Sequence, residues 1–184
     1  NDAAVISTAT AGLTETDAVL TASGTLTVTD VDSPATFTAG TIAGTYGSLT
    51  INAAGNWTYT ASSAHDEFAA GTTYSDVFTV TSADGTTSTV TVNILGTNDA
   101  AVISTATANL AETNAVLTAS GTLTISDVDS PATFTAATLT GTYGSLTINA
   151  AGNWSYTASS AHDEFASGTT YSDMFTVTSA DGTT

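Results

Sequence analysis

The stretch SLTINAAGNWTYT, residues 48–60, decides the fold class of this chain. In both halves of it, apolar side chains alternate with polar ones: Leu49 and Ile51, then Trp57 and Tyr59. Alternation with a period of two places one face of a strand in a core and the other in solvent. The loop AAGN between the halves suits a short hairpin turn with Gly55 in the left-handed conformation. The stretch therefore predicts an antiparallel β-hairpin.

The same alternation, interrupted by Gly, Asn, Asp and Ser, predicts further strands on both sides of this hairpin. The expected strands are residues 3–7, 24–30, 35–42, 48–52, 56–62, 74–82 and 86–95. No segment has a convincing helical period. About seven short strands in roughly a hundred residues are typical of an immunoglobulin-like Greek-key β-sandwich.

The whole pattern occurs twice. Asn1 aligns with Asn98 without a gap to the end of the chain, and Trp57 then matches Trp154. We therefore expect two tandem β-sandwiches, residues 1–97 and 98–184, joined end to end. The second copy has no counterpart of residues 88–96 (STVTVNILG), so we expect it to lack its last strand. A cut from a longer array explains this better than an exchange of strands between chains.

The charge of the chain excludes several partners. It has 17 acidic residues and neither Lys nor Arg, which gives a formal net charge of −17. Without cations it cannot neutralise phosphates, so nucleic-acid binding and attachment to anionic membranes are disfavoured. No run approaches the roughly 20 apolar residues of a membrane helix, and the absence of Cys rules out disulfides. The natural partner of such a chain is a cation.

The predicted strand order sorts the acidic residues into two groups, because loops fall alternately at the two ends of an antiparallel sandwich. One end is expected to gather Asp2, Asp30, Asp32 and Asp84, and the other Glu15, Asp66 and Glu67. The equivalents in the second copy are Asp99, Asp127, Asp129 and Asp181 at one end and Glu112, Asp163 and Glu164 at the other. At the linker, residues 98–99 (Asn-Asp), the Glu15 group of the first copy is expected to meet the Asp127 group of the second copy.

Several carboxylates in a small volume repel one another unless a cation lies among them. Oxygen ligands with flexible geometry favour Ca²⁺ over zinc or copper. We therefore predict calcium sites at the junction, with Asn98 and Asp99 as linker ligands. Ordinary alternatives exist for each group: an Asx turn before Pro34 for the Asp30 pair, an Asp-Gly turn for Asp84, and solvated loops for the others. Asp76 and Asp173 are expected to point outward from a strand.

The segments ASGTLTVTDVDSPATF, YGSLTINAAGNWTYT and FTVTSADGTTSTVTVNILGTNDA resemble the VCBS-type repeat of large bacterial RTX adhesins and surface proteins. The resemblance covers all of the first copy and all that is present of the second. It implies a cadherin-like or immunoglobulin-like sandwich, an extracellular location at the bacterial surface, and a calcium-stiffened spacer in adhesion or biofilm formation. Members of that family commonly carry Pro after the linker NDA, where this chain has Ala4 and Ala101.

Three functions are open at this point. The first is an extender whose partners are neighbouring repeats of the same chain. The second is a subunit of an extracellular filament built by repeat packing or strand exchange with other copies. The third is a carbohydrate-binding module using Trp57 and Tyr59, although a buried core explains these aromatic residues better. His65 beside two acids could suggest a general base, but the chain has no surrounding catalytic motif, so we expect no enzyme.

Overall fold

The computed structural model describes all 184 residues, and the protein is all-β. It contains no helix, and hence none that could cross a membrane. The chain divides into two compact units, Asn1–Asn98 and Asp99–Thr184. Each unit corresponds to one copy of the repeat.

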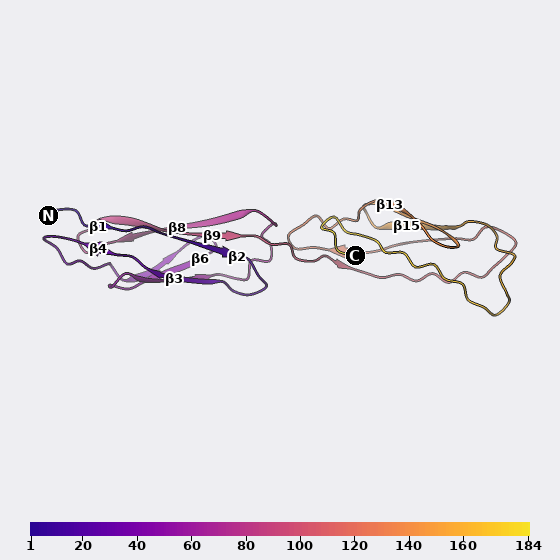
Figure 1. The fold of residues 1–184 in the computed structure, drawn as a ribbon, viewed down its shortest axis with the longest axis horizontal. Helices are drawn as coiled ribbons and strands as arrows, with labels where there is room; N and C mark the ends of the chain where they lie inside the picture. The colour runs from indigo at the N-terminus through magenta and orange to yellow at the C-terminus, as the bar shows by residue number, and fades with distance from the viewer. The chain divides into compact units, whose positions relative to one another are not determined.

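The first unit contains nine strands, arranged in two main sheets and one short pair (Figure 1). The strands are β1 Val5–Ile6, β2 Ala9–Thr14, β3 Thr21–Thr25, β4 Val28–Thr29, β5 Gly40–Ala43, β6 Gly47–Ile51, β7 Asn56–Ala61, β8 Thr73–Thr81 and β9 Thr87–Leu95. One sheet has the order β3-β7-β6-β5 and the other the order β2-β9-β8, while β1 pairs with β4. The hairpin predicted from residues 48–60 is β6–β7, with Gly55 at φ 84° as expected.

The strand β2 was not predicted, and of β3 only the last two residues fall within an expected strand. The sequences ATAGLT and TASGT contain little besides small residues, so neither shows a strong alternation of large apolar and polar side chains. Their strand state comes from tertiary pairing, because β2 runs parallel to β9 and β3 pairs antiparallel with β7. The expected strand 24–30 is therefore wrong as a single element: it is divided between β3 and β4, which belong to different sheets.

The expected strand 35–42 is also wrong in extent. Its first part contributes one isolated bridge, Phe37 to Ser82, and the regular strand begins only at Gly40. These corrections do not change which loops lie at which end of the sandwich. Because β1 and β2 continue in one direction, Glu15 still follows at the end where β9 leaves the sheet, and its N–H donates to the Leu95 carbonyl at 2.8 Å.

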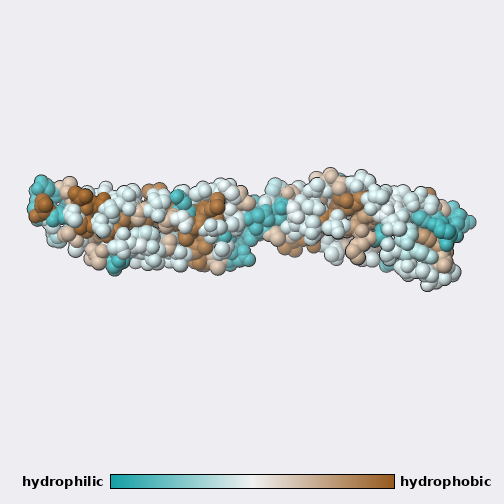
Figure 2. Space-filling model, in the orientation of Figure 1, coloured by the Kyte–Doolittle hydropathy of each residue, from teal (hydrophilic) through white to brown (hydrophobic).

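The core of the first unit lies between its two main sheets. It is formed by the inward side chains of β6 and β7 on one sheet and of β8 and β9 on the other. Trp57 is 4 % exposed and Tyr59 is fully buried, so neither offers a platform for sugars. The outward positions are mostly Thr, Ser and Ala, and the visible surface is accordingly near neutral in hydropathy over most of its area (Figure 2).

The second unit repeats only part of this architecture. Its strands are β10 Val102–Ile103, β11 Thr118–Thr122, β12 Ile125–Ser126, β13 Ala137–Thr140, β14 Gly144–Ile148 and β15 Asn153–Ala158. They form the sheet β11-β15-β14-β13 and the pair β10-β12, whose registers repeat those of the first unit. The sheet equivalent to β2-β9-β8 is not formed. The expectation that the second copy lacks its last strand agrees with this arrangement.

Candidate metal site

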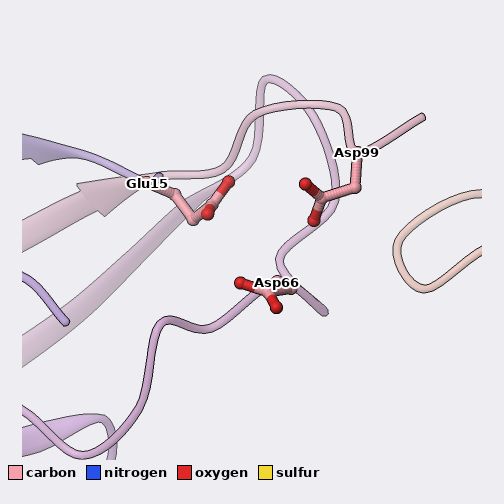
Figure 3. Close-up of side chains that lie close together, drawn as sticks. All are labelled: Glu15, Asp66 and Asp99. Carbon is pink, nitrogen blue, oxygen red and sulfur yellow. The ribbon is translucent and has the colours of Figure 1, made fainter. Parts of the chain in front are cut away.

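Three carboxylates converge at the end of the first unit where β2 and β9 terminate (Figure 3). Glu15 follows β2, Asp66 lies in the loop between β7 and β8, and Asp99 lies in the linker after β9. Each offers one oxygen, and these three oxygens lie within 4.8 Å of one another. Distances of this kind allow one ion of the size of Ca²⁺ to contact all three residues.

Glu15 is the best-defined member of this cluster because it is 1 % exposed. Its Oε2 accepts hydrogen bonds from the Thr97 N–H, at 3.3 Å, and from the Thr97 hydroxyl. Its Oε1 is buried and has no hydrogen-bond partner. A buried carboxylate oxygen without a partner is unfavourable unless a positive charge offsets it, and this chain has no Lys or Arg to supply one. The donor set therefore fits a hard cation.

Asp66 is presented by a loop that an adjacent histidine fixes in place. His65 has φ 67°, an uncommon conformation for a residue other than glycine. Its Nε2–H donates to the Tyr46 carbonyl at 2.7 Å, and its Nδ1–H donates to Glu67 Oε1 at 2.9 Å. The ring also stacks on Phe68, which in turn stacks on Tyr74. The backbone on both sides of Asp66 is therefore anchored to the core.

Both ring nitrogens of His65 face oxygen acceptors, so the geometry favours the imidazolium form. Burial by itself lowers the pKa of His65, but the hydrogen bonds to Glu67 and to the Tyr46 carbonyl outweigh this and raise it above its ordinary value. The hydrogen bond from His65 lowers the pKa of Glu67. Glu67 thus pairs with His65 instead of joining the cluster around Asp66.

At the opposite end of the first unit, Asp30 and Asp32 occupy an Asx-type turn. Asp30 Oδ1 accepts the N–H groups of Asp32 at 3.0 Å and of Ser33 at 2.8 Å. Its Oδ2 is buried and has no partner. Asp32 in turn accepts the Asp2 N–H, with the shorter of two distances at 3.1 Å. The Asx turn thus uses Oδ1 of Asp30, whereas a cation would use Oδ2 of the same carboxylate.

Asp84 has a structural role at this end. Its carboxylate accepts the Ala4 N–H at 3.0 Å and the Thr86 hydroxyl at 2.7 Å, and it also accepts the Ser82 hydroxyl. These hydrogen bonds, that from Ser82 first, lower the pKa of Asp84 well below its usual range. The hydrogen bonds from Ser82 and Thr86 hold the turn before β9, and the one from Ala4 ties the N-terminal segment to it, so these contacts explain Asp84 without an ion.

The second unit repeats this arrangement around Asp127 and Asp129. Asp127 Oδ1 accepts the N–H groups of Asp129 and Ser130, while the Oδ2 atoms of both aspartates are buried without partners. Asp129 Oδ1 accepts the Asp99 N–H at 3.3 Å. Burial, followed by the hydrogen bond and the charge of the neighbouring Asp127, raises the pKa of Asp129, because two adjacent carboxylates disfavour ionisation of both. Asp181 holds the turn as Asp84 does, and accepts the Ala101 N–H.

The remaining predicted ligands are not gathered into a cluster. Glu112 is exposed, unlike its counterpart Glu15. Asp163 is exposed as well, and Glu164 pairs with His162 at 2.7 Å as Glu67 pairs with His65. Asn98 is an exposed linker residue.

The outward placement expected for Asp76 is wrong. It is 4 % exposed and accepts the N–H groups of Thr45 at 2.6 Å and of Tyr46 at 3.0 Å. Asp173 likewise accepts the Thr142 and Tyr143 N–H groups. The signal was present in the sequence, because Asp76 shares the parity of the inward residues Phe78 and Val80 along β8.

Comparison with protein families gives one match for each repeat. A family model described as a bacterial cadherin-like domain matches residues 1–96 and again 98–184. No curated protein matches the chain. The two matched segments correspond closely to the two compact units.

Proposed function

Because this chain belongs to the family of bacterial cadherin-like domains, we propose that it is an extender segment of a secreted bacterial surface adhesin. Its repeats hold a distal adhesive region away from the cell, in support of cell adhesion or biofilm formation. Calcium bound at the ends of the repeats stiffens the linker between them. The VCBS-type resemblance supports the adhesin assignment.

One observation carries the calcium part of the proposal: the buried, unpartnered Oε1 of Glu15 beside Asp66 and Asp99. A cluster of exposed acids would need no ion, since water solvates it. Glu15 is enclosed, however, and its neighbours Asp66 and Asp99 add negative charge to the same small volume. A bound cation would lower the energy of all three groups together.

Glu15, Asp66 and Asp99 would hold the ion, and the ion would supply positive charge and crosslink three separate segments. These are the end of β2, the loop between β7 and β8, and the linker. All three offer carboxylate oxygens, the ligand type of Ca²⁺, and the chain has no Cys to favour a softer metal. Linking the three segments would restrict the linker backbone at Asp99.

The experiment is a calcium titration of the full chain followed by calorimetry and by melting, with and without chelator. Extracellular calcium modules bind with Kd values of about 10⁻⁴–10⁻³ M, so titration into the millimolar range is required. At ten times Kd, the ion stabilises the folded state by about 1.4 kcal/mol. For a domain of this size that corresponds to a rise of roughly 5–10 °C in Tm.

Glu15→Gln tests the site, and Asp17→Asn is its matched control. Asp17 lies two residues further along, is exposed, and is already Asn114 in the second copy. Glu15→Gln should melt at or above the wild-type temperature without calcium, because it removes a buried charge, yet lose the calcium-dependent rise of the first repeat. Asp17→Asn should keep that rise. A first repeat whose melting is indifferent to millimolar calcium and to chelator would overturn the calcium proposal.

A further inference from the structure

The strand β8 lies at the edge of the sheet β2-β9-β8, with no strand on its other side (Figure 1). With nine residues it is longer than the other edge strands of the first unit, which are β2, β3 and β5. Its register with β9 runs from Thr73 to Thr81 without a bulge, and it contains no Pro. Folded proteins commonly use a bulge, a Pro or an outward charge to prevent an exposed edge from pairing with another chain. The edge of β8 has neither a bulge nor a Pro.

The backbone of β8 has free hydrogen-bonding groups on this edge. At the end of the strand, the Thr81 carbonyl points away from β9 and accepts the Thr38 N–H at 2.8 Å. Residues along an antiparallel strand point their N–H and C=O groups alternately to either side. Those of Ser75, Val77 and Thr79 therefore also point away from β9, and no backbone hydrogen bond occupies them. Each of the three residues offers one donor and one acceptor to an added strand.

The outward side chains of β8 carry no charge, although the chain has a net charge of −17. This outward row consists of Thr73, Ser75, Val77, Thr79 and Thr81. Val77 is the large apolar member of the row and is 63 % exposed. The single acid of the strand, Asp76, faces the core, where the Thr45 and Tyr46 N–H groups already bind it. Two copies of this acidic chain therefore repel each other least where both present this row.

The outward row is also complementary to itself. When two β8 strands lie antiparallel about a two-fold axis at Val77, Ser75 lies opposite Thr79 of the second copy, and Val77 lies opposite Val77. These are the residues whose backbone groups point outward, so each facing pair exchanges two hydrogen bonds. Val–Val and Ser–Thr are favourable cross-strand pairs, and no like charges face each other. A second copy thus meets by symmetry the requirements that an unrelated strand would meet only by chance.

We propose that β8 is a self-association surface, through which two copies of the chain pair edge to edge and form one continuous sheet. The contact is small compared with the interfaces of permanent dimers, so the dimer is weak and reversible. A two-fold contact leaves neither β8 edge free, and the association therefore stops at a dimer. The acidic surfaces outside β8 still repel each other, so dimerisation requires salt to screen them.

The test is sedimentation equilibrium of the full chain in chelator, at low and at high salt. The screening length is about 30 Å at 0.01 M salt and about 3 Å at 1 M. We expect a monomer at the lower salt concentration, and at the higher one a dimer fraction that rises with protein concentration. Growth beyond a dimer would contradict the two-fold contact.

Hydrogen exchange at high salt locates the contact. The amides of Ser75, Val77 and Thr79 should become protected, because they would pair with the second copy. When about nine-tenths of the chain is dimeric, their exchange should slow by about tenfold. The amides of Phe78 and Val80 are the internal control, since they already point toward β9 and should not change.

Val77→Lys is the decisive variant, and Ser23→Lys is its matched control. Each adds one positive charge at an exposed position of an edge strand, and Ser23 belongs to β3 in the other main sheet. Val77→Lys would place two like charges directly opposite each other, so it should weaken dimerisation by about tenfold. Ser23→Lys should dimerise at least as well as the wild type, because it lowers the net charge of the chain. Calorimetry of each variant checks that the first unit remains folded.

Three results would overturn the proposal. The first is a chain that stays monomeric at high salt and high protein concentration. The second is dimerisation that Val77→Lys leaves unchanged, or that both variants weaken equally, since the contact would then lie elsewhere. The third is protection confined to the second unit. Because chelator is present throughout, these results do not depend on calcium, and the two proposals can fail separately.

Discussion

The buried carboxylate of Asp76 should be one of the strongest single contributions to the stability of the first repeat. It lies on β8 and reaches across to the turn between β5 and β6, where it accepts two backbone N–H groups, those of Thr45 and Tyr46. The Tyr59 hydroxyl also approaches it, at 3.4 Å. Burial of Tyr59, followed by the charge of Asp76, raises the pKa of that hydroxyl. Asp76→Ala removes every acceptor from this site at once.

The expected loss follows from the groups left behind. Each of the two N–H donors loses a hydrogen bond to a charged acceptor, worth about 1.5–3 kcal/mol. Removal of a buried charge in an acidic chain returns part of this free energy. We therefore expect Asp76→Ala to lower the free energy of unfolding of the first repeat by about 3 kcal/mol, which is roughly 12–24 °C in Tm.

Urea denaturation and calorimetry measure the loss, with hydrogen exchange to assign each transition to its repeat. Asp173→Ala is the matched control, because Asp173 makes the same two contacts in the second repeat. There Tyr156 is only partly buried, so water can replace the lost acceptor and the loss should be about 1 kcal/mol. A loss below 1 kcal/mol for Asp76→Ala, or equal losses for the two variants, would refute this reasoning.

Three further predictions concern pH, packing and the relative stability of the repeats. The pKa of His65 is raised and that of Glu67 is lowered. Their ion pair therefore stabilises the first repeat fully between pH 4.5 and pH 6.5, the ordinary pKa values of Glu and His. This stabilisation is lost as the pH rises through the raised pKa of His65. His65→Gln should therefore flatten the fall in the Tm of the first repeat as the pH rises above 6.5, measured by calorimetry; an unchanged slope would contradict this. Gly24→Ala should destabilise the first repeat by about 1–3 kcal/mol in urea denaturation, because the new Cβ would lie 2.6 Å from the Trp57 ring. An unchanged stability would contradict this and would show that the ring can shift. The second repeat should melt below the first in calorimetry, since it buries far fewer core side chains; a single shared transition would indicate coupled repeats.

The sequence predicted the main hairpin and the inward residues because local alternation records which face of a strand is buried. Leu49, Ile51, Trp57 and Tyr59 are all in the core, as the pattern indicated. The same rule would have placed Asp76 inward, had it been applied to a charged residue. A carboxylate among the inward-facing apolar residues of a strand indicates a site with hydrogen-bond donors, because a carboxylate is buried only where such donors are present.

The repeat, the all-β class and the acidic character were determined by the sequence alone. They follow from internal similarity, a period of two and the residue counts, none of which needs coordinates. The tertiary structure decided the rest. Strands β2 and β3 exist through pairing with distant strands, since their small side chains carry no local signal. The burial of Glu15 is also tertiary, because Glu15 lies against the end of β9, where its carboxylate is buried beside Thr97.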